Sequence, residues 1–239
     1  MASFKFPGFS NGAEPLEKIS NTPVVVIGLG RFGTALADEL MNYGVEVLGL
    51  DSNERIVREH ATDYTDCAVV DSTDPEALRQ LGVDESQRVV IAIGGSLEGS
   101  ILTASNLVEM GIPDIWAKAN SEKHGRILEQ LGVHHVIRPE SDTGRRIAHL
   151  LGGRFIDYAD LDRDYGMIKM TPPESMRSGE WDPGKLWKKY KVDVVAVKSP
   201  SVGWHPYRAY TALNVSDLIV VAGDPARLEA FAQVRRVDC

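Results

Sequence analysis

The sequence predicts an α/β fold in which a doubly wound parallel sheet is followed by a small α+β module. Two observations predict this class. Over residues 23–152, short runs of Val, Ile and Leu alternate with stretches of helical periodicity, which is typical of strands buried on both faces of a parallel sheet. After the glycines at positions 152 and 153 the pattern changes to shorter strands interrupted by a Pro172-Pro173 break. We therefore expect a flexible arm at 1–22, a first domain at 23–152 and a second domain at 153–239.

The first apolar run, at residues 24–27, is followed directly by a glycine-rich turn. The turn reads Gly28-Leu29-Gly30-Arg31-Phe32-Gly33 and leads into a predicted helix that Gly44 ends. A second apolar strand at 45–50 then delivers Asp51. Strand, GxGxxG turn, helix, strand and acidic residue in this order are the fingerprint of a Rossmann-like dinucleotide-binding fold.

Each residue type in this fingerprint has a physical role in binding a nucleotide. Gly28 allows the tight turn, Gly30 lets backbone N–H groups approach a pyrophosphate, and Gly33 permits close packing of helix on strand. Arg31 can pair with phosphate oxygens, which the positive end of the helix dipole also favours. Asp51 would accept hydrogen bonds from ribose hydroxyls and repel a 2′-phosphate, so NADP is not expected. The pattern indicates an adenine nucleotide, without indicating its purpose.

Four more strands and four more helices complete the expected first sheet and lead to its end. The strands are expected at 68–70, 89–93, 115–119 and 134–137, and the helices from about residue 53 and at 75–81, 97–110 and 122–131. A helix at 139–151 precedes the expected domain boundary. Six strands with interleaved helices make a doubly wound sheet.

Small or polar residues follow several of these strands, where ligands bind in open α/β sheets. Gly94-Gly95-Ser96 follow the fourth strand, and small residues there leave room for a ribose. Asp71 could read the amino edge of adenine, although the segment from Ser72 onward could equally cap the helix at 75–81, and the two roles are compatible. The candidate residues outside the glycine turn are Asp51, Ser52, Asp71, Ser72, Thr73, Ile93, Gly94 and Lys118.

Composition excludes several classes of protein. A formal charge of −8 over 239 residues argues against a broad nucleic-acid surface. No apolar run approaches the ~20 residues that a membrane helix needs. The arm at 1–22 lacks the cationic start and apolar core of a signal peptide. With only two cysteines, Cys67 and Cys239, the simplest interpretation is a reduced, cytosolic protein without a disulfide framework.

The second domain is expected to be a module of about eighty residues, which is small for a catalytic domain. Its strands are expected at 155–161, 166–170, 192–198 and 218–222, and its helices at 183–190 and 225–234.

The motifs in this order resemble RCK proteins, the regulators of K⁺ conductance. The first domain resembles their amino-terminal domain in the glycine turn, Asp51, Ala92-Ile93-Gly94, the stretch at 115–119, and Ile137-Arg138-Pro139-Glu140-Ser141-Asp142. The second domain resembles their small carboxyl-terminal domain through the strands at 194–198 and 217–223. The resemblance covers about residues 22–234 and is greatest with the cytosolic gating subunits of Ktr/Trk-type bacterial potassium uptake systems.

This resemblance implies a function and an assembly. Subunits would pair through a crossover helix and form an octameric ring on the cytoplasmic face of a membrane subunit that translocates K⁺. ATP and ADP would stabilise different ring shapes and so open or close the pore, with NAD or NADH as other possible ligands. It implies neither catalysis nor binding to nucleic acid.

The resemblance also assigns residues. Gly28, Gly30, Arg31 and Gly33, with Phe32 in the same turn, would hold phosphates, Asp51 the ribose, the segment from Asp71 to Thr73 the base, and Lys118 would lie near the phosphates. Glu140 would approach the terminal phosphate through Mg²⁺ or Ca²⁺. Arg138 stands where similar proteins have His. Some relatives bind cyclic di-AMP at the second domain, near the segment that matches Lys188, Lys189 and Tyr190. A solvated helix end would also explain these three polar residues.

Two other classes of function are weighed against this interpretation. An NAD-dependent oxidoreductase, or an NAD(H) redox sensor, would use the same fingerprint, and Tyr165 and Lys169 match the YxxxK pair of short-chain dehydrogenases. That pair needs a helix, which Gly166 and the Pro172-Pro173 break disfavour. The six histidines show no ligand spacing for zinc. A redox-sensing transcription factor would need a basic recognition helix, which the strand-rich second domain does not provide.

Overall fold

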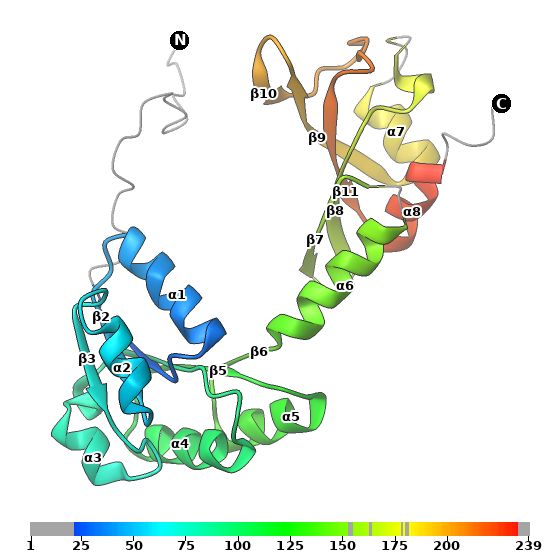
Figure 1. Cartoon of the computed structure of the whole chain (residues 1–239). Coiled ribbons are helices and arrows are strands. Elements are labelled where there is room, and N and C mark those ends of the chain that lie inside the picture. The colour runs from blue at the N-terminus through cyan, green and yellow to red at the C-terminus, as the bar shows by residue number, and fades with distance from the viewer. Residues whose placement is uncertain (1–21, 153–154, 163, 178, 180–181, 234–239) are drawn as a thin grey trace, which may run out of the picture. The chain divides into compact units, whose positions relative to one another are not determined.

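The computed structural model describes residues 22–152, 155–162, 164–177, 179 and 182–233. The expected arm, apart from Thr22, and Cys239 lie outside the described residues. Contacts divide the chain into two compact units, Met1–Pro139 and Glu140–Cys239. Figure 1 labels the elements of both units.

Among the described residues, the first unit contains a six-stranded parallel sheet with the order β3-β2-β1-β4-β5-β6. The strand order runs outward in both directions from the β1–β4 pair, so the predicted doubly wound sheet is confirmed. The strands are β1 (Val24–Ile27), β2 (Val47–Asp51), β3 (Asp66–Val69), β4 (Arg88–Ile91), β5 (Asp114–Lys118) and β6 (His135–Ile137).

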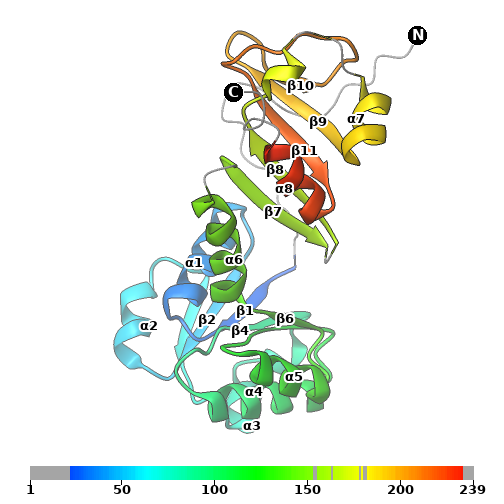
Figure 2. The same ribbon diagram turned by 90° about the vertical axis from the view of Figure 1, so that its right-hand side faces the viewer.

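Helices cover both faces of this sheet, as Figures 1 and 2 show. The side chains of β1 alternate between two apolar cores: Val24 and Val26 face α1, whereas Val25 and Ile27 share a core with residues of α3, α4 and α5. Burial on both faces explains why this strand is apolar at every position. The helical segments are α1 (Arg31–Asn42), α2 (Glu54–His60), α3 (Pro75–Gln80), η1 (Val83–Glu85), α4 (Leu97–Glu109) and α5 (Glu122–Leu131).

The described part of the second unit contains an antiparallel sheet with the order β10-β9-β11-β8-β7. Its core includes Leu186 of α7, Phe231 of α8, and Ile168 and Ile219 from the central strands. The predicted small α+β module is therefore confirmed. The elements are α6 (Pro139–Leu151), β7 (Asp157–Asp162), β8 (Tyr165–Met170), η2 (Glu174–Met176), α7 (Pro183–Tyr190), β9 (Val192–Ser199), β10 (Gly203–Pro206), β11 (Leu218–Gly223) and α8 (Pro225–Gln233).

Helix α6 contacts strand β7 of the antiparallel sheet. Arg146 donates a hydrogen bond of 2.6 Å to Asp157 of β7, and the ring of His149 stacks on Tyr158 with 4.1 Å between centroids. The contact boundary at Pro139 thus lies one helix before the boundary expected after residue 152, because α6 is grouped with the unit that it touches. The assignment of α6 to the first domain as a crossover helix stays a prediction.

Candidate nucleotide-binding site

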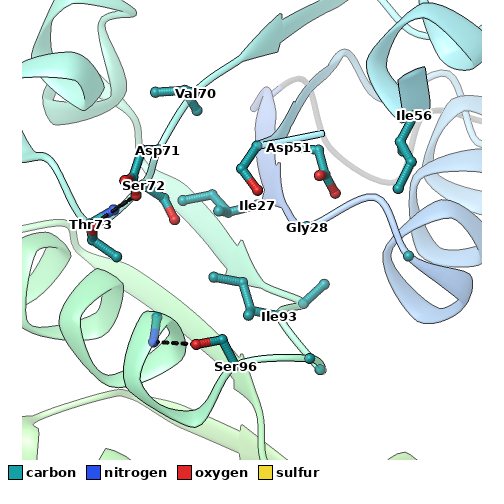
Figure 3. A pocket seen from close by; sticks show the side chains of 16 residues that line it. Ile27, Gly28, Asp51, Ile56, Val70, Asp71, Ser72, Thr73, Ile93 and Ser96 are labelled. Atoms are coloured by element: carbon teal, nitrogen blue, oxygen red, sulfur yellow. Dashed lines mark hydrogen bonds between the residues drawn. The ribbon is translucent and has the colours of Figure 1, made fainter. Parts of the chain in front are cut away.

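A cavity of about 450 Å³ lies at the carboxyl ends of the parallel strands of the first unit. Its walls come from the segments that follow β1, β2, β3 and β4, including the point between β1 and β4 where the strand order reverses. Ligands bind at this point in open α/β sheets. Figure 3 shows the labelled side chains arranged around this space. The lining residues are Ile27, Gly28, Gly30, Asp51, Ser52, Ile56, Val70, Asp71, Ser72, Thr73, Ala92, Ile93, Gly94, Gly95, Ser96 and Gly99.

The three glycines of the turn meet different surroundings. Gly28 has φ +97°, and a Cβ there would lie 3.1 Å from the backbone of Ala92 and Ile93. A Cβ on Gly33 would lie 1.9 Å from the carbonyl oxygen of Gly28, so only glycine allows this packing. A Cβ on Gly30, in contrast, would have no atom of the described residues within 4 Å. Gly28 and Gly33 therefore shape the turn, whereas Gly30 leaves open space on the cavity side.

The amino end of α1 is exposed toward a ligand in a way that the other helices of this unit are not. Its N-cap is Gly30, and within the described residues no side chain caps it and its first turn holds no acidic residue. Side chains of Asn53, Asp74, Ser96 and Ser121 cap α2, α3, α4 and α5. The N–H groups and positive dipole end of α1 are thus left for an anion, beside exposed Arg31 at its first position.

The backbone fixes the carboxylate of Asp51. Its Oδ2 accepts a hydrogen bond of 2.8 Å from the N–H of Leu29, and its Oδ1 accepts one of 2.8 Å from the N–H of Asn53. Each carboxylate oxygen can accept more than one hydrogen bond. Asp51 therefore ties the glycine turn to the end of β2 and keeps acceptor capacity for a diol at the cavity.

The segment after β3 forms the opposite wall. Asp71 Oδ1 accepts hydrogen bonds from the N–H of Thr73 at 3.0 Å and from its hydroxyl at 2.7 Å. These bonds stabilise the charged form and lower the pKa of Asp71. The N-cap of α3 is Asp74, which accepts from the N–H of Glu76 at 2.9 Å. The capping role and the lining of the cavity thus fall on neighbouring residues of one segment.

A polar group borders the cavity beyond Gly94. Lys118, at the end of β5, is buried, with its Nζ 5.7 Å from the ring centre of Phe32. Asn120 donates a hydrogen bond of 2.8 Å to the carbonyl of Gly94. The backbone N–H of Asn120 in turn donates to Nδ1 of buried His124 at 3.2 Å, and burial lowers the pKa of this imidazole. Lys118 therefore lies within the structure bordering the cavity, not on its lining.

The structure brings most residues predicted for the site together. Gly28, Gly30, Asp51, Ser52, Asp71, Ser72, Thr73, Ile93 and Gly94 line the cavity. Arg31, Phe32 and Gly33 belong to α1 behind the turn, Lys118 ends β5, and Glu140 belongs to the second unit in the first turn of α6. The ligand contacts of all these residues stay predictions.

Several lining residues were not predicted for the site, among them Ile56, Val70 and Gly99. Ser96, one of the small residues expected after the fourth strand, lines the cavity and caps α4, because its Oγ accepts from the N–H of Gly99 at 2.9 Å. Ile56 and Val70 carry no chemical signal beyond apolarity, and they give the cavity its apolar walls.

Three further observations concern other classes of protein. Tyr165 and Lys169 lie on β8, a strand as expected, where residues four apart are about 13 Å apart along the chain. Among the described residues, no group of three His, Cys, Asp or Glu side chains could hold a metal ion. None of the helices formed by these residues has the length and apolar character needed to cross a bilayer.

Residues 24–139 match the model of the TrkA-N domain family. Ktr system potassium uptake protein C of Bacillus subtilis (strain 168) is 30% identical over 207 residues, which cover 86% of this chain and 94% of that protein. Ktr system potassium uptake protein A of the same organism is 34% identical over 182 residues, covering 76% and 82%. Its namesake of Vibrio alginolyticus is 33% identical over 213 residues, covering 88% and 96%.

Solved structures share the fold. The GsuK RCK domain superposes with a TM-score of 0.62 at 18% identity, covering 93% of this chain. The chain spans about half of that structure's length, 49%. A GsuK channel bound to NAD gives a TM-score of 0.60 at 15% identity, covering 92% of this chain and 40% of that one.

Proposed function

The chain belongs to the TrkA-N family of RCK proteins that includes the Ktr potassium uptake proteins A and C, and from this premise we propose that it is a nucleotide-sensing regulatory subunit of a potassium uptake system. The cavity at the β1–β4 switch point is the observation that carries this proposal. It combines an uncapped helix end for phosphates, the backbone-held Asp51 for a ribose and apolar walls for a base.

The residues present fit an adenine nucleotide. Open space at Gly30 admits a phosphate group close to the amino end of α1, where Arg31 adds a cation. Asp51 favours an unmodified ribose over a 2′-phosphorylated one. We propose ATP and ADP as the ligands that are exchanged, with NAD or NADH competing for the same cavity. A GsuK channel that shares the fold is bound to NAD, which supports the inclusion of NAD among these ligands.

Glu140 is proposed to sense the third phosphate through Mg²⁺ or Ca²⁺. Carboxylate and phosphate oxygens are ligands that both ions prefer. Glu140 would then contribute only when ATP is bound, and such differential interaction is what allows a ligand to shift a conformational equilibrium. A helix-capping role in the first turn of α6 would need no cation.

Assembly with other chains is a further part of the proposal. None of the residues of α6 is buried, and Ile147 and Leu151 expose 48% and 83% of their surface. Helix α6 therefore has apolar area that a second copy of the chain could cover, which supports a dimer-based ring, proposed to be octameric. This ring would act on the cytoplasmic side of a membrane subunit that translocates K⁺.

The binding of cyclic di-AMP at the second unit stays a prediction.

Calorimetric titration of the purified chain tests the proposal. We expect ADP and ATP to bind at one site. Asp51→Ala should reduce the binding free energy of both by a similar amount, about 1–3 kcal/mol, because both ligands present the same ribose. The control is Asp84→Ala, an exposed carboxylate of η1 that does not line the cavity. Absence of adenine-nucleotide binding by the wild type, or unchanged affinity in Asp51→Ala, would refute the proposed site. A change in nicotinamide absorbance with turnover would instead support the oxidoreductase alternative.

A further inference from the structure

Helix α4 holds the segment that follows β3. We call Asp71, Ser72 and Thr73 the base-side loop. The side-chain amide of Asn106 donates to the carbonyl oxygens of Ser72 at 3.3 Å and Thr73 at 3.0 Å. One helical turn earlier, the hydroxyl of Thr103 forms a hydrogen bond of 2.7 Å with the hydroxyl of Ser72. Two α4 side chains thus hold two consecutive residues of the loop by backbone and side chain.

The hydroxyl contact of this attachment is buried, and the two bonds from Asn106 are partly buried. Ser72 exposes 8% of its surface and Thr103 none. A buried hydroxyl that loses its partner destabilises its local conformation, because it is also shielded from water. Asn106 and Thr103 are three residues apart on one helix, so both face the loop. The loop can therefore change conformation only if these bonds break.

The attachment leaves one acceptor of the loop available to a ligand. Within the described residues, Asp71 Oδ1 is occupied by the two bonds from Thr73, whereas Oδ2 has no hydrogen-bond partner. Asp71 is exposed and lines the cavity. The amino group at position 6 of adenine is a donor that such a carboxylate oxygen can accept.

We propose that Asn106 and Thr103 are positioning residues for base recognition: they hold the base-side loop so that Asp71 can accept from the 6-amino group of adenine. This inference rests on the proposed adenine-nucleotide site and deepens it. Neither residue lines the cavity, so each acts through the loop. A merely structural role would lower the affinity for every nucleotide equally, whereas positioning changes the discrimination between bases.

The test compares ATP with purine riboside 5′-triphosphate, which lacks only the 6-amino group, by calorimetry on the full chain. The wild type should bind ATP about tenfold more tightly, the ratio expected for one hydrogen bond to a charged acceptor. Asn106→Ala and Thr103→Val should reduce this ratio to about twofold or less, mainly through weaker ATP binding. Thr103→Ser, which keeps the hydroxyl, should restore the wild-type ratio. Ser105→Ala is the control, because its hydroxyl bonds Glu109 on the same helix and does not touch the loop.

A double-mutant cycle shows whether Asn106 acts through Asp71. Asp71→Ala alone should abolish the preference for ATP, and adding Asn106→Ala should not lower it further. Wild-type protein that binds both triphosphates equally, or an Asn106→Ala variant that keeps the wild-type ratio, would overturn the inference while leaving the nucleotide site intact. Wild-type protein that binds neither triphosphate would overturn the proposed function and, with it, this inference.

Discussion

At the residue scale, Gly33 is expected to matter for folding and Gly30 for ligand binding. A methyl group at Gly33 would overlap the carbonyl oxygen of Gly28, whereas at Gly30 it would enter open space. We expect Gly33→Ala to destabilise the first unit by about 2 kcal/mol, because α1 must move away from β1. Gly30→Ala should change stability by less than about 0.5 kcal/mol but weaken ADP binding about tenfold or more, since its Cβ would face the phosphates. Thermal unfolding and calorimetry of both variants check this.

The two variants serve as controls for each other. Equal loss of stability in both would mean that Gly30 is a packing residue like Gly33. If a stably folded Gly30→Ala protein kept the full affinity for ADP, the proposed position of the phosphates at the glycine turn would be wrong.

Much of the cavity was predictable residue by residue, because its polar members follow strands in the sequence. Asp51, Asp71 and Gly94 each stand just after an apolar run, and parallel strands bring their carboxyl ends together. Val70 and Ile56 could not be distinguished from ordinary core residues. The bonds from Asn106 were also not predictable, since a polar residue within a helix indicates no partner 33 residues away in the chain.

At the scale of the element, the end of α7 contains a conformation that glycine would relieve. Lys191, its C-cap residue, has φ +61°, in the left-handed region that favours glycine. We expect Lys191→Gly to stabilise the second unit by about 0.5–1 kcal/mol. Loss of the contact between its Nζ and the ring of Trp187, 5.6 Å away, would offset a part of this gain. Urea denaturation followed by circular dichroism measures the change.

Lys189→Gly is the matched control. Lys189 also lies over an aromatic ring, that of Tyr190 at 5.0 Å, but it sits inside the helix, where glycine costs about 1 kcal/mol. If Lys191→Gly raises the free energy of unfolding and Lys189→Gly lowers it, the left-handed backbone conformation of Lys191 explains the gain. Destabilisation by both would show that contacts of the lysine side chains dominate.

Elements with a strong pattern were predictable, and those without one were not. The buried strands of the first sheet, the helix at α7 and the strand at β8 all follow clear signals of periodicity or turn chemistry. Strand β10 was not predicted, because Gly203, Trp204, His205 and Pro206 show no alternation and include two strand breakers. Its pairing with β9, from Trp204 opposite Lys198 to Pro206 opposite Ala196, is a tertiary effect.

At the scale of the whole molecule, the chain joins a unit with the candidate nucleotide cavity to a second unit with exposed apolar area on α6. The doubly wound parallel sheet and the small α+β module after it were predictable, because connection rules allow few alternatives. The grouping of α6 with the second unit was not predictable, since its amphipathic pattern is compatible with packing on either unit. In the structure α6 contacts β7 through the ion pairs of Arg145 and Arg146 and through the stacking of His149 on Tyr158.

Potassium flux tests the central claim, that nucleotide bound in the first unit regulates K⁺ uptake. Vesicles would contain a Ktr-type membrane subunit and this chain, and K⁺ uptake would be followed with ATP, with ADP and without nucleotide. We expect ATP and ADP to give different fluxes with the wild type, and Gly30→Ala, at nucleotide concentrations that saturate the wild type alone, to give the same flux under all conditions. A wild-type protein that binds both nucleotides yet leaves the K⁺ flux unchanged between them would contradict the account.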